Sequence, residues 1–396
     1  MPAASAPSIS TDEQLHWLAL RMTPGLGAKT AIQLIESFRT PQALFRASKS
    51  EIEAAGASVG VARNISSGCA FEDAVTQQQR LAEAGASIIP VGSPLYPPRL
   101  REIYDPPPIL FARGRVELLR TRSIGVVGTR HPTTYGTAAA GRLARDLADA
   151  GLTIASGMAR GIDTAAHKAV LEGGGNTIAV FGCGVDELYP AENRKLAAQL
   201  AESGLLLSDF PMGTPPYPQN FPIRNRIISG ISLGVLIVEG GQYSGSAITA
   251  RLAAEHGREV FAVPGNITSK MSWGPNLLIK QGAKLVQDWN DVVTELQPED
   301  RRWLVDRCRK QLSLDESNDS VTDSGDSASS ATDQMTEVGR AVLFSLKTDT
   351  PVPLDHLVES LQPHSASEII AALFELELSG FVRQLPGKSF LRVWLG

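Results

Sequence analysis

The sequence predicts an α/β protein built on a Rossmann-like, doubly wound parallel sheet. Between residues 123 and 286, short apolar runs rich in β-branched residues alternate with amphipathic stretches. Near-continuous apolar strands are typical of a sheet buried on both faces, and the intervening stretches supply crossover helices. Helical periodicity flanks this region on both sides. The predicted strands are 123–128, 152–156, 177–181, 205–208, 235–238, 260–263 and 284–286.

The length and composition indicate a globular protein of several domains. A chain of 396 residues is too long for one ordinary hydrophobic core, so two or three domains are expected. No apolar run reaches membrane-spanning length, and residues 1–10 lack the regions of a secretory signal. We therefore expect a cytoplasmic protein without a membrane partner. The cysteines are too scattered for a disulfide framework or a cysteine-based metal site; they are Cys69, Cys183 and Cys308.

The formal net charge of −5 hides an uneven distribution. Between Lys310 and Arg340 the chain has seven acidic residues and no basic one. Without those seven charges the net charge changes from −5 to +2. The total charge therefore does not exclude a nucleic-acid partner, because a partner meets local patches of charge.

Residues 1–85 are predicted to form a small domain of short helices. Apolar residues from Leu15 to Met22 recur at helical spacing, and a glycine-containing turn at residues 23–30 precedes a second helix. The pattern is similar to a helix-hairpin-helix or SAM-like module, whose turn can offer backbone N–H groups to a phosphate. A packing module without a ligand is the alternative, and we favour it.

The composition predicts two connecting segments. Residues 86–121 are rich in proline, which is excluded from helix interiors, so we expect an extended connection along the α/β domain of residues 86–298. Residues 299–333 form the second connection, in which the stretch from about Ser313 to Asp333 is rich in Ser and Asp and cannot bury enough apolar surface to order itself. This segment is expected to be an acidic flexible linker.

The C-terminal residues 334–396 are predicted to form a winged helix. Apolar residues at helical spacing predict three helices, and residues 381–385 and 389–393 predict a terminal hairpin. The third helix would repel phosphate, so we expect the domain to contact protein or to stabilise the chain. This helix has no basic residue, and its acids are Glu368, Glu375 and Glu377.

The candidate ligand-binding residues lie in loops that follow the predicted strands. In an open parallel sheet, ligands bind beyond the carboxyl ends of the strands. Glycines let backbone amides approach a ligand, hydroxyls can donate to phosphate, and arginines supply a fixed positive charge. A tight turn explains any one such loop, but several together indicate an anionic ligand. The residues expected to bind it in these loops are Gly128, Thr129, Arg130, Ser156, Gly157, Arg160, Gly161, Ser244, Gly245 and Ser246.

The segment at residues 220–230 carries two arginines around an amide, which are Arg224, Asn225 and Arg226. We expect both guanidinium groups to point out of the packed face and to clamp an anion, because their planar donor fork suits phosphate oxygens. A helix start with two surface charges and a capping Asn is the alternative. An aromatic residue nearby would offer a stacking face to a base. Candidates for this face, each of them also compatible with a core position, are Tyr217, Phe221 and Tyr243.

The sequence contains no recognised catalytic or cofactor motif. The G-x-G-x-x-G and Walker A patterns are absent, and no G-x-S-x-G elbow follows a predicted strand. The two matches to the latter pattern are Gly56-Ala-Ser-Val-Gly60, among the predicted N-terminal helices, and Gly230-Ile-Ser-Leu-Gly234, directly before a predicted strand. No His, Cys and acid cluster has metal-ligand spacing. Asp163 and His167 are four residues apart and would share a helix face. Over catalysis we favour a structural role for Asp163, which caps its helix or holds a neighbouring arginine, and a packed or surface position for His167. No catalytic residue, metal or cofactor is expected.

Five segments of the α/β region carry a family pattern. They are Gly128-Thr-Arg, Ser156-Gly-Met-Ala-Arg-Gly-Ile-Asp, Phe221-Pro-Ile-Arg-Asn-Arg-Ile-Ile-Ser-Gly, Ser244-Gly-Ser-Ala-Ile-Thr-Ala and Val263-Pro-Gly-Asn. In this order, within residues 96–289, they closely resemble the DNA-processing protein A (DprA/Smf) family of bacteria. The helices before this region and the winged helix after it are similar to those of some members by layout.

The resemblance implies a Rossmann-like domain that binds single-stranded DNA, protects incoming DNA in natural transformation and passes it to the RecA recombinase, usually as a homodimer. The family's Gly-Ser/Thr-Arg arginine falls on Arg130, and its Phe-Pro-x-Arg-Asn-Arg arginines fall on Arg224 and Arg226. A lysine that some members place after a Tyr-Pro pair has no match, because Ala191 stands there. The candidates to replace it, about one helical turn on, are Arg194 and Lys195.

Two other functions fit parts of the sequence. A nucleotide phosphoribohydrolase of the lysine-decarboxylase-like type uses a similar sheet, and Val238-Glu-Gly-Gly241 matches part of its pattern. Its fuller Pro-Gly-Gly-x-Gly-Thr segment is missing. A pure interaction scaffold would have no affinity for oligonucleotides. We expect instead a sequence-independent and salt-sensitive hold on single-stranded DNA by arginines, amides and an aromatic face, without cutting.

Overall fold

The chain forms two compact units, one ending at Leu304 and one beginning at Val305, which are described separately. Among the described residues, no helix combines the length and the apolar character needed to cross a membrane. The structure is a computed structural model that describes residues 9–242, 244–304, 337–347, 352–362, 364–365, 368–369, 372–373, 376, 381–385 and 389–393.

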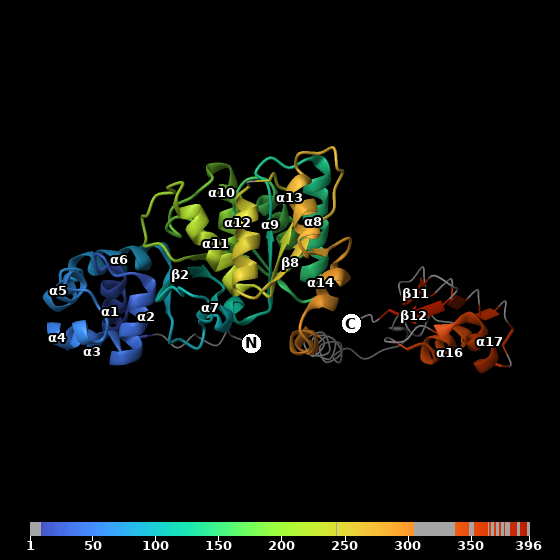
Figure 1. Cartoon of the computed structure of the whole chain (residues 1–396), viewed down its shortest axis with the longest axis horizontal. Coiled ribbons are helices and arrows are strands. Elements are labelled where there is room, and N and C mark those ends of the chain that lie inside the picture. The colour runs from blue at the N-terminus through green and yellow to red at the C-terminus, as the bar shows by residue number, and fades with distance from the viewer. Residues whose placement is uncertain are drawn as a thin grey trace, which may run out of the picture. The chain divides into compact units, whose positions relative to one another are not determined.

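The first unit is built on a nine-stranded sheet with the order β1-β2-β6-β5-β4-β3-β7-β8-β9 (Figure 1). Strands β3 to β9 are parallel, as predicted. The direction of winding reverses between β3 and β7, which places the switch point of the sheet at their carboxyl ends. The parallel strands are β3 (Ser123–Val127), β4 (Thr153–Ser156), β5 (Thr177–Val180), β6 (Leu205–Ser208), β7 (Gly234–Ile237), β8 (Glu259–Ala262) and β9 (Lys284–Leu285).

The expected extended connection at residues 86–121 is instead partly sheet. Strand β2 (Ile109–Gly114) pairs antiparallel with β6, and β1 (Ser87–Pro90) pairs antiparallel with β2, so the sheet is mixed. Pro106, Pro107 and Pro108 directly precede β2 and lie outside its ladder, so their missing N–H groups cost no ladder hydrogen bond. The same segment contains helix α7 (Pro98–Arg101) and the 3-10 helix η1 (Val116–Arg120).

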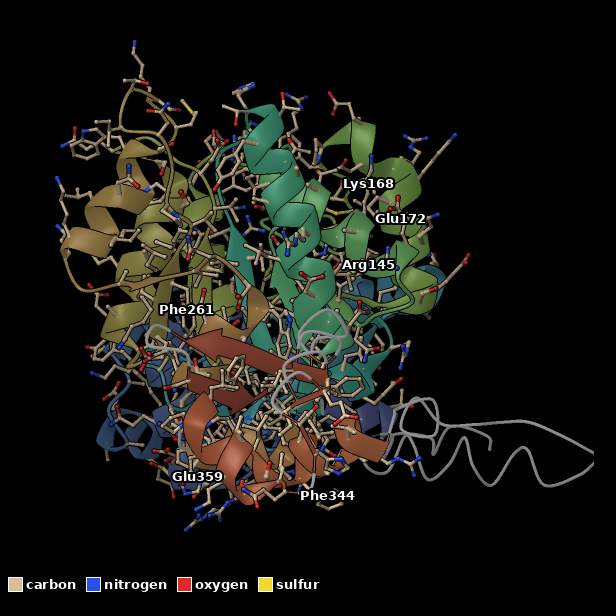
Figure 2. All side chains as sticks on the ribbon, turned by 90° about the vertical axis from the view of Figure 1, so that its right-hand side faces the viewer. Arg145, Lys168, Glu172, Phe261, Phe344 and Glu359 are labelled. Carbon is tan, nitrogen blue, oxygen red and sulfur yellow. The ribbon has the colours of Figure 1, made fainter. Side chains whose placement is uncertain are left out.

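Helices cover both faces of the sheet because successive strand side chains point in opposite directions. Ile124 and Val126 pack against α8, α9 and α14, whereas Val127 and Ile178 belong to the core that includes α11 and α12. Figure 2 shows Arg145 and Lys168 on the outer side of α8 and α9. These helices are α8 (Thr134–Asp149), α9 (Ile162–Glu172), α10 (Arg194–Ser203), α11 (Asn220–Ile231), α12 (Gly245–Glu255), α13 (Trp273–Lys280) and α14 (Trp289–Glu295).

The N-terminal region is a bundle of short helices, as predicted (Figure 1). Its buried face shares one hydrophobic core with β1 and β2. Two polar contacts tie it to the loop after β6: Arg21 donates to the carbonyl of Asp209 at 2.9 Å, and Gln77 donates to the carbonyl of Met212 at 3.1 Å. The helices are α1 (Thr11–Met22), α2 (Ala28–Phe38), α3 (Pro41–Arg46), α4 (Lys49–Ala54), α5 (Val59–Ser67) and α6 (Phe71–Ala84).

The first residues of the expected linker belong to the first unit. Residues 298–304 are helical, and Asp300 and Leu304 are buried. Asp300 accepts a hydrogen bond from Arg99 and forms an ion pair with Arg122, each at 2.7 Å, and these contacts neutralise its buried charge. The acidic composition thus placed the end of the folded region too early. Residues 305–333 of the expected linker lie outside the described residues.

The second unit contains the helices and hairpin of the predicted winged helix. Helices α16 (Glu337–Ser345) and α17 (Leu354–Ser360) share a core with helical residues near Leu373. Strands β11 (Val382–Leu385) and β12 (Ser389–Arg392) pair as a hairpin, and a short β10 (Val352–Pro353) adds a third strand. Of the three acids in the third helix, Glu368 accepts from Ser365, while Glu375 and Glu377 lie outside the described residues.

Candidate nucleic-acid interface

A cavity of about 400 Å³ opens at the switch point between β3 and β7. It is lined by the loop after β3, the chain entering α9, the first half of α11 and the start of α12. Loops far apart in the sequence therefore meet there because parallel strands end at the same side of the sheet. The expected site residues that line it are Gly128, Thr129, Arg130, Phe221, Arg224, Asn225, Ser244, Gly245 and Ser246.

The exposed Arg130 and the half-buried Phe221 form a cationic and aromatic wall of this cavity. The guanidinium carbon of Arg130 lies 5.3 Å from the centroid of the Phe221 ring, a cation–π distance. The ring of Tyr189 supports Phe221 at 5.4 Å between centroids. Arg130 is exposed and has no carboxylate partner within the part of the chain that the structure describes. Its charge is therefore available to an anion.

Arg224 supplies a second positive charge, from the buried floor of the cavity. Its side chain is only 4% exposed, and Nη1 donates to the carbonyl of Gly157 at 2.7 Å and to that of Val180. Nε donates to Oδ1 of Asn225 at 3.1 Å. Burial lowers the pKa of Arg224 to about 10, against the opposing attraction of Asp163, so it stays protonated at neutral pH.

The expectation that both arginines of α11 point out of the packed face is wrong. Arg226 is 9% exposed, and Nη2 donates to Oδ2 of Asp209 at 2.6 Å. It also donates to the carbonyl of Asp105, whose carboxylate lies 3.5 Å from Nε. Helix α11 is buried on nearly all sides, so its polar residues are held by protein partners. The two arginines thus do not form the clamp that the sequence indicated.

The start of α12 presents amides and hydroxyls to the cavity. The first N–H groups of a helix have no intrahelical acceptor, and the helix dipole adds positive potential there. Ser244 is the N-cap residue, but its hydroxyl pairs with that of Ser246 at 2.7 Å and makes no capping bond. A Cβ on Gly245 would meet no atom within 4 Å, so a ligand can approach its backbone closely.

Asp163 and His167 lie at the buried start of α9. Oδ2 of Asp163 accepts from the amides of Gly157 and Ala159, at 3.1 and 3.3 Å, in the loop before the helix. The N-cap residue of α9 is Gly161 and no side chain caps this helix, so the expected capping role of Asp163 is wrong. Burial raises its pKa to about 6, although Arg224 opposes the shift. His167 is fully buried and bonds Thr177 at 2.7 Å through Nδ1; burial, aided by Arg224, lowers its pKa to about 3. His167 is therefore a packed, neutral residue, and it does not line the cavity.

The other expected residues of the loop after β4 are close-packed. Ser156 is fully buried and donates to the carbonyl of Val126 at 2.6 Å. A Cβ on Gly157 would lie 2.6 Å from Nη2 of Arg224, and one on Gly161 would lie 2.3 Å from the carbonyl oxygen of Thr129. Gly161 also has a φ of +81°, which few other residues adopt. These positions are set by packing beneath the cavity.

The remaining cationic candidates lie outside the cavity lining. Arg160 pairs with Glu192 at 2.5 Å, and both side chains are exposed. Arg194 and Lys195 are exposed at the start of α10. Tyr217 is 50% exposed, but it does not line the cavity. Tyr243 lies outside the described residues.

Some lining residues were not identified from the sequence. Thr249 follows Ser246 by three residues on α12, so helical spacing was a usable signal. Pro218 and Pro222 flank Phe221 and shape the same wall. No sequence signal marks Ile228, because its apolar side chain is equally suited to the core.

The comparisons with known proteins identify the family. A family model described as "DNA recombination-mediator protein A" matches residues 87–297, and one described as "DprA winged helix domain" matches residues 326–388. "Protein Smf" of Escherichia coli is 39% identical over 78% of each chain. The chain belongs to the DNA-processing protein A (DprA/Smf) family. "DNA processing protein DprA" of Bacillus subtilis is 47% identical over 54% of this chain and 72% of its own length.

A solved DprA/Smf structure has the same fold. "DNA processing protein A (DprA)" from Streptococcus pneumoniae superposes with a TM-score of 0.62 and 34% identity, over 72% of this chain and 98% of the other. The match confirms the Rossmann-like sheet, and the family model confirms the C-terminal winged helix. The chain is accordingly a DNA-processing protein of the recombination-mediator family.

Proposed function

We propose that this DprA/Smf member binds single-stranded DNA, without sequence preference, in the cavity at the switch point. The observation that supports this proposal is the pairing of the exposed Arg130 with the ring of Phe221, 5.3 Å apart. Phosphates and unstacked bases are exposed together only in single strands, so a cation beside an aromatic face suits them better than duplex. Arg224 adds positive potential beneath, and the amides at Gly245 are placed to meet a phosphate oxygen.

In this proposal, binding protects incoming DNA and helps to load the RecA recombinase during natural transformation and recombination. Family membership supports this role, and with it a homodimer and a cytoplasmic location. The strand is held and not cut. The two residues nearest to a catalytic pair, Asp163 and His167, are engaged by backbone amides and by Thr177.

The domain assignment is part of the proposal. Residues 1–85 are a helical module, 86–304 form the DNA-processing domain, 305–333 connect it to the rest, and 334–396 form the winged helix. The winged helix contacts protein or stabilises the chain. Deletion after about Gln311 should therefore leave strand binding intact, and loss of binding in that variant would contradict this assignment.

A hydrolase function is less well supported by the site. The acid of the Val238-Glu-Gly-Gly241 segment, Glu239, is 2% exposed. It accepts from the amide of Thr133 at 2.9 Å and from its hydroxyl at 2.6 Å, which anchors the start of α8. A carboxylate so engaged is a poor general base. Release of adenine from AMP, detected by chromatography, would support hydrolysis, and a chain without affinity for oligonucleotides would indicate a scaffold.

Fluorescence anisotropy titrations test the proposal directly. Single- and double-stranded oligonucleotides are titrated at two salt concentrations. We expect tighter binding of the single strand, and for Arg130→Ala a shallower salt dependence, by about 0.7 in the logarithmic slope for one lost phosphate contact. Arg142→Ala is the matched control, since its side chain is 74% exposed and pairs only with Asp146 one helical turn away. Equal binding by the Arg130→Ala and Arg142→Ala proteins would reject the site.

A further inference from the structure

The charges around the switch point are divided between its two sides. On the β7 and β8 side, residues 128–138, 240–254 and 264–281 contain no Asp or Glu. The loops on the β4, β5 and β6 side are acidic by comparison. Their exposed or half-exposed acids are Asp186, Glu187 and Glu192. Asp163 and Asp209 are buried on that side, as is Glu239 in the loop after β7.

Exposed cations lie on both sides of the switch point, since Arg194 and Lys195 are exposed at the start of α10 on the acidic side. On the acidic side, Arg160 is already paired with Glu192 at 2.5 Å. On the other side, Lys270 is exposed and has no carboxylate partner among the described residues. A polyanion that extends beyond the cavity therefore meets less repulsion over β7 and β8.

Hydrogen bonds join the loops that expose no acidic side chain into one surface. The hydroxyl of Tyr135, in the first turn of α8, donates to the carbonyl of Pro264 at 2.9 Å. The amide of Gly240 donates to the carbonyl of Met271 at 2.7 Å, and that of Gly274 donates to Gly240 at 2.9 Å. Neighbouring strands are only about 4.8 Å apart, so this surface begins within one or two strand spacings of the cavity.

The joined surface exposes side chains suited to unpaired nucleotides. Tyr135 is 53% exposed and Trp273 is 42% exposed, so each leaves part of a ring open to solvent. Ile267 is 91% exposed on the loop between them, beside Lys270. Aromatic rings with an adjacent cation form the usual platform for stacked bases and their phosphates. The surface ends beyond β9, where Asp288 and Asp291 cap α14.

We propose that single-stranded DNA leaves the cavity over the loops after β7 and β8, where Tyr135, Lys270 and Trp273 form a second binding subsite. This inference rests on the proposed function and specifies the path of the strand, from the cavity towards β8. Bases stack on the two rings, and the Lys270 ammonium contacts the intervening phosphate. The cavity holds the first few nucleotides, so only a longer strand reaches the second subsite.

Oligothymidines of two lengths, about six and about twenty nucleotides, separate the two subsites in anisotropy titrations. The full-length protein should bind the longer strand more tightly. Lys270→Glu and Trp273→Ala should each reduce affinity for the longer strand by about tenfold and leave the shorter one unchanged, because the latter occupies the cavity alone. Trp273→Phe retains an aromatic ring, so this variant should keep most of the affinity for the longer strand that Trp273→Ala loses.

A second variant tests whether the strand instead leaves the cavity towards α10, over the loops after β5 and β6. Arg194→Ala combined with Lys195→Ala removes the exposed cations at the start of α10 and should not change the advantage of the longer strand. If that double variant removes the advantage and Lys270→Glu does not, the proposed direction is wrong. Lys270 is exposed and needs no repacking, so its result does not depend on how well Trp273→Ala folds. If neither strand binds the unaltered protein, the proposed function itself fails, and this inference fails with it.

Discussion

Arg226 and Asp209 form a buried ion pair, with 2.6 Å between Nη2 and Oδ2. The two side chains are 10% and 5% exposed, so water cannot solvate either charge if its partner is removed. Removal of one member of such a pair leaves the other charge uncompensated in a low-dielectric environment. The arginine that the sequence suggested as a DNA contact is therefore primarily a structural residue.

Arg226→Ala should lower the free energy of unfolding by about 3–5 kcal/mol, because the Asp209 carboxylate stays buried without its partner. Urea unfolding followed by circular dichroism measures this as a lower midpoint at an unchanged slope. Arg142→Ala, at a surface pair of 3.5 Å, should change the same quantity by less than about 1 kcal/mol. A normally stable Arg226→Ala protein that has lost strand binding would instead return Arg226 to the DNA contact surface.

Phe221→Ala should weaken binding of a short oligothymidine by about 1–3 kcal/mol, because the base loses its stacking face beside Arg130. Tyr217→Ala is the comparison, since this ring is 50% exposed nearby but does not line the cavity. Isothermal titration calorimetry gives both affinities directly. A larger loss for Tyr217→Ala than for Phe221→Ala would move the stacking face to the outer surface.

The parallel strands and the meeting of their loops could be predicted because each depends on local pattern. Buried parallel strands are short apolar runs, and their carboxyl ends share one side of the sheet whatever the loop sequences are. Strand β2 (Ile109–Gly114) shows the limit of this reasoning. Its apolar run follows three prolines, and pairing with β6 depends on a partner almost a hundred residues away.

The direction of the two arginines on α11 could not be predicted from the segment itself. The charge partner of Arg226 is supplied by Asp209, on the loop after β6, and the acceptors of Arg224 are carbonyls of the β4 loop and of β5. Local spacing fixes which residues share a helix face, but it does not reveal that other elements cover that face. The accessibility of Arg130 could be predicted more readily, because it lies in a loop directly after a strand and this loop lines the cavity.

The opposite pKa shifts of Asp163 and His167 predict a specific pH dependence of stability. The pKa of His167 falls from 6.5 to about 3 on folding, so its stabilising contribution is present above pH 6.5 and is lost as the pH falls towards 3. The pKa of Asp163 rises from 3.8 to about 6, so its contribution is present below pH 3.8 and is lost as the pH rises through 6. Between these limits the two effects oppose each other.

Single variants should separate the two titrations. Removal of the His167 titration in His167→Asn should make the protein less sensitive to acid than the unaltered chain, by up to about 1.4 kcal/mol per pH unit between pH 6 and 4. Asp163→Asn should make it more sensitive over the same interval. Urea unfolding at several pH values measures both slopes. Identical slopes for all three proteins would show that neither group changes its pKa on folding.

Two glycines of the site should respond differently to the same added methyl group. A Cβ on Gly157 would lie 2.6 Å from Nη2 of Arg224 and 2.7 Å from Oδ2 of Asp163, so Gly157→Ala must displace both. It should lower the free energy of unfolding by about 1–3 kcal/mol and weaken strand binding with it. At Gly245 the outcome should differ. An added Cβ would meet no atom within 4 Å, so Gly245→Ala should leave the free energy of unfolding unchanged or slightly higher. It should nevertheless weaken binding, because the methyl group occupies the space through which a phosphate approaches the amides of α12. Thermal unfolding and anisotropy of both variants distinguish a glycine needed for packing from one needed for a ligand, and full binding by Gly245→Ala would remove the α12 amides from the site.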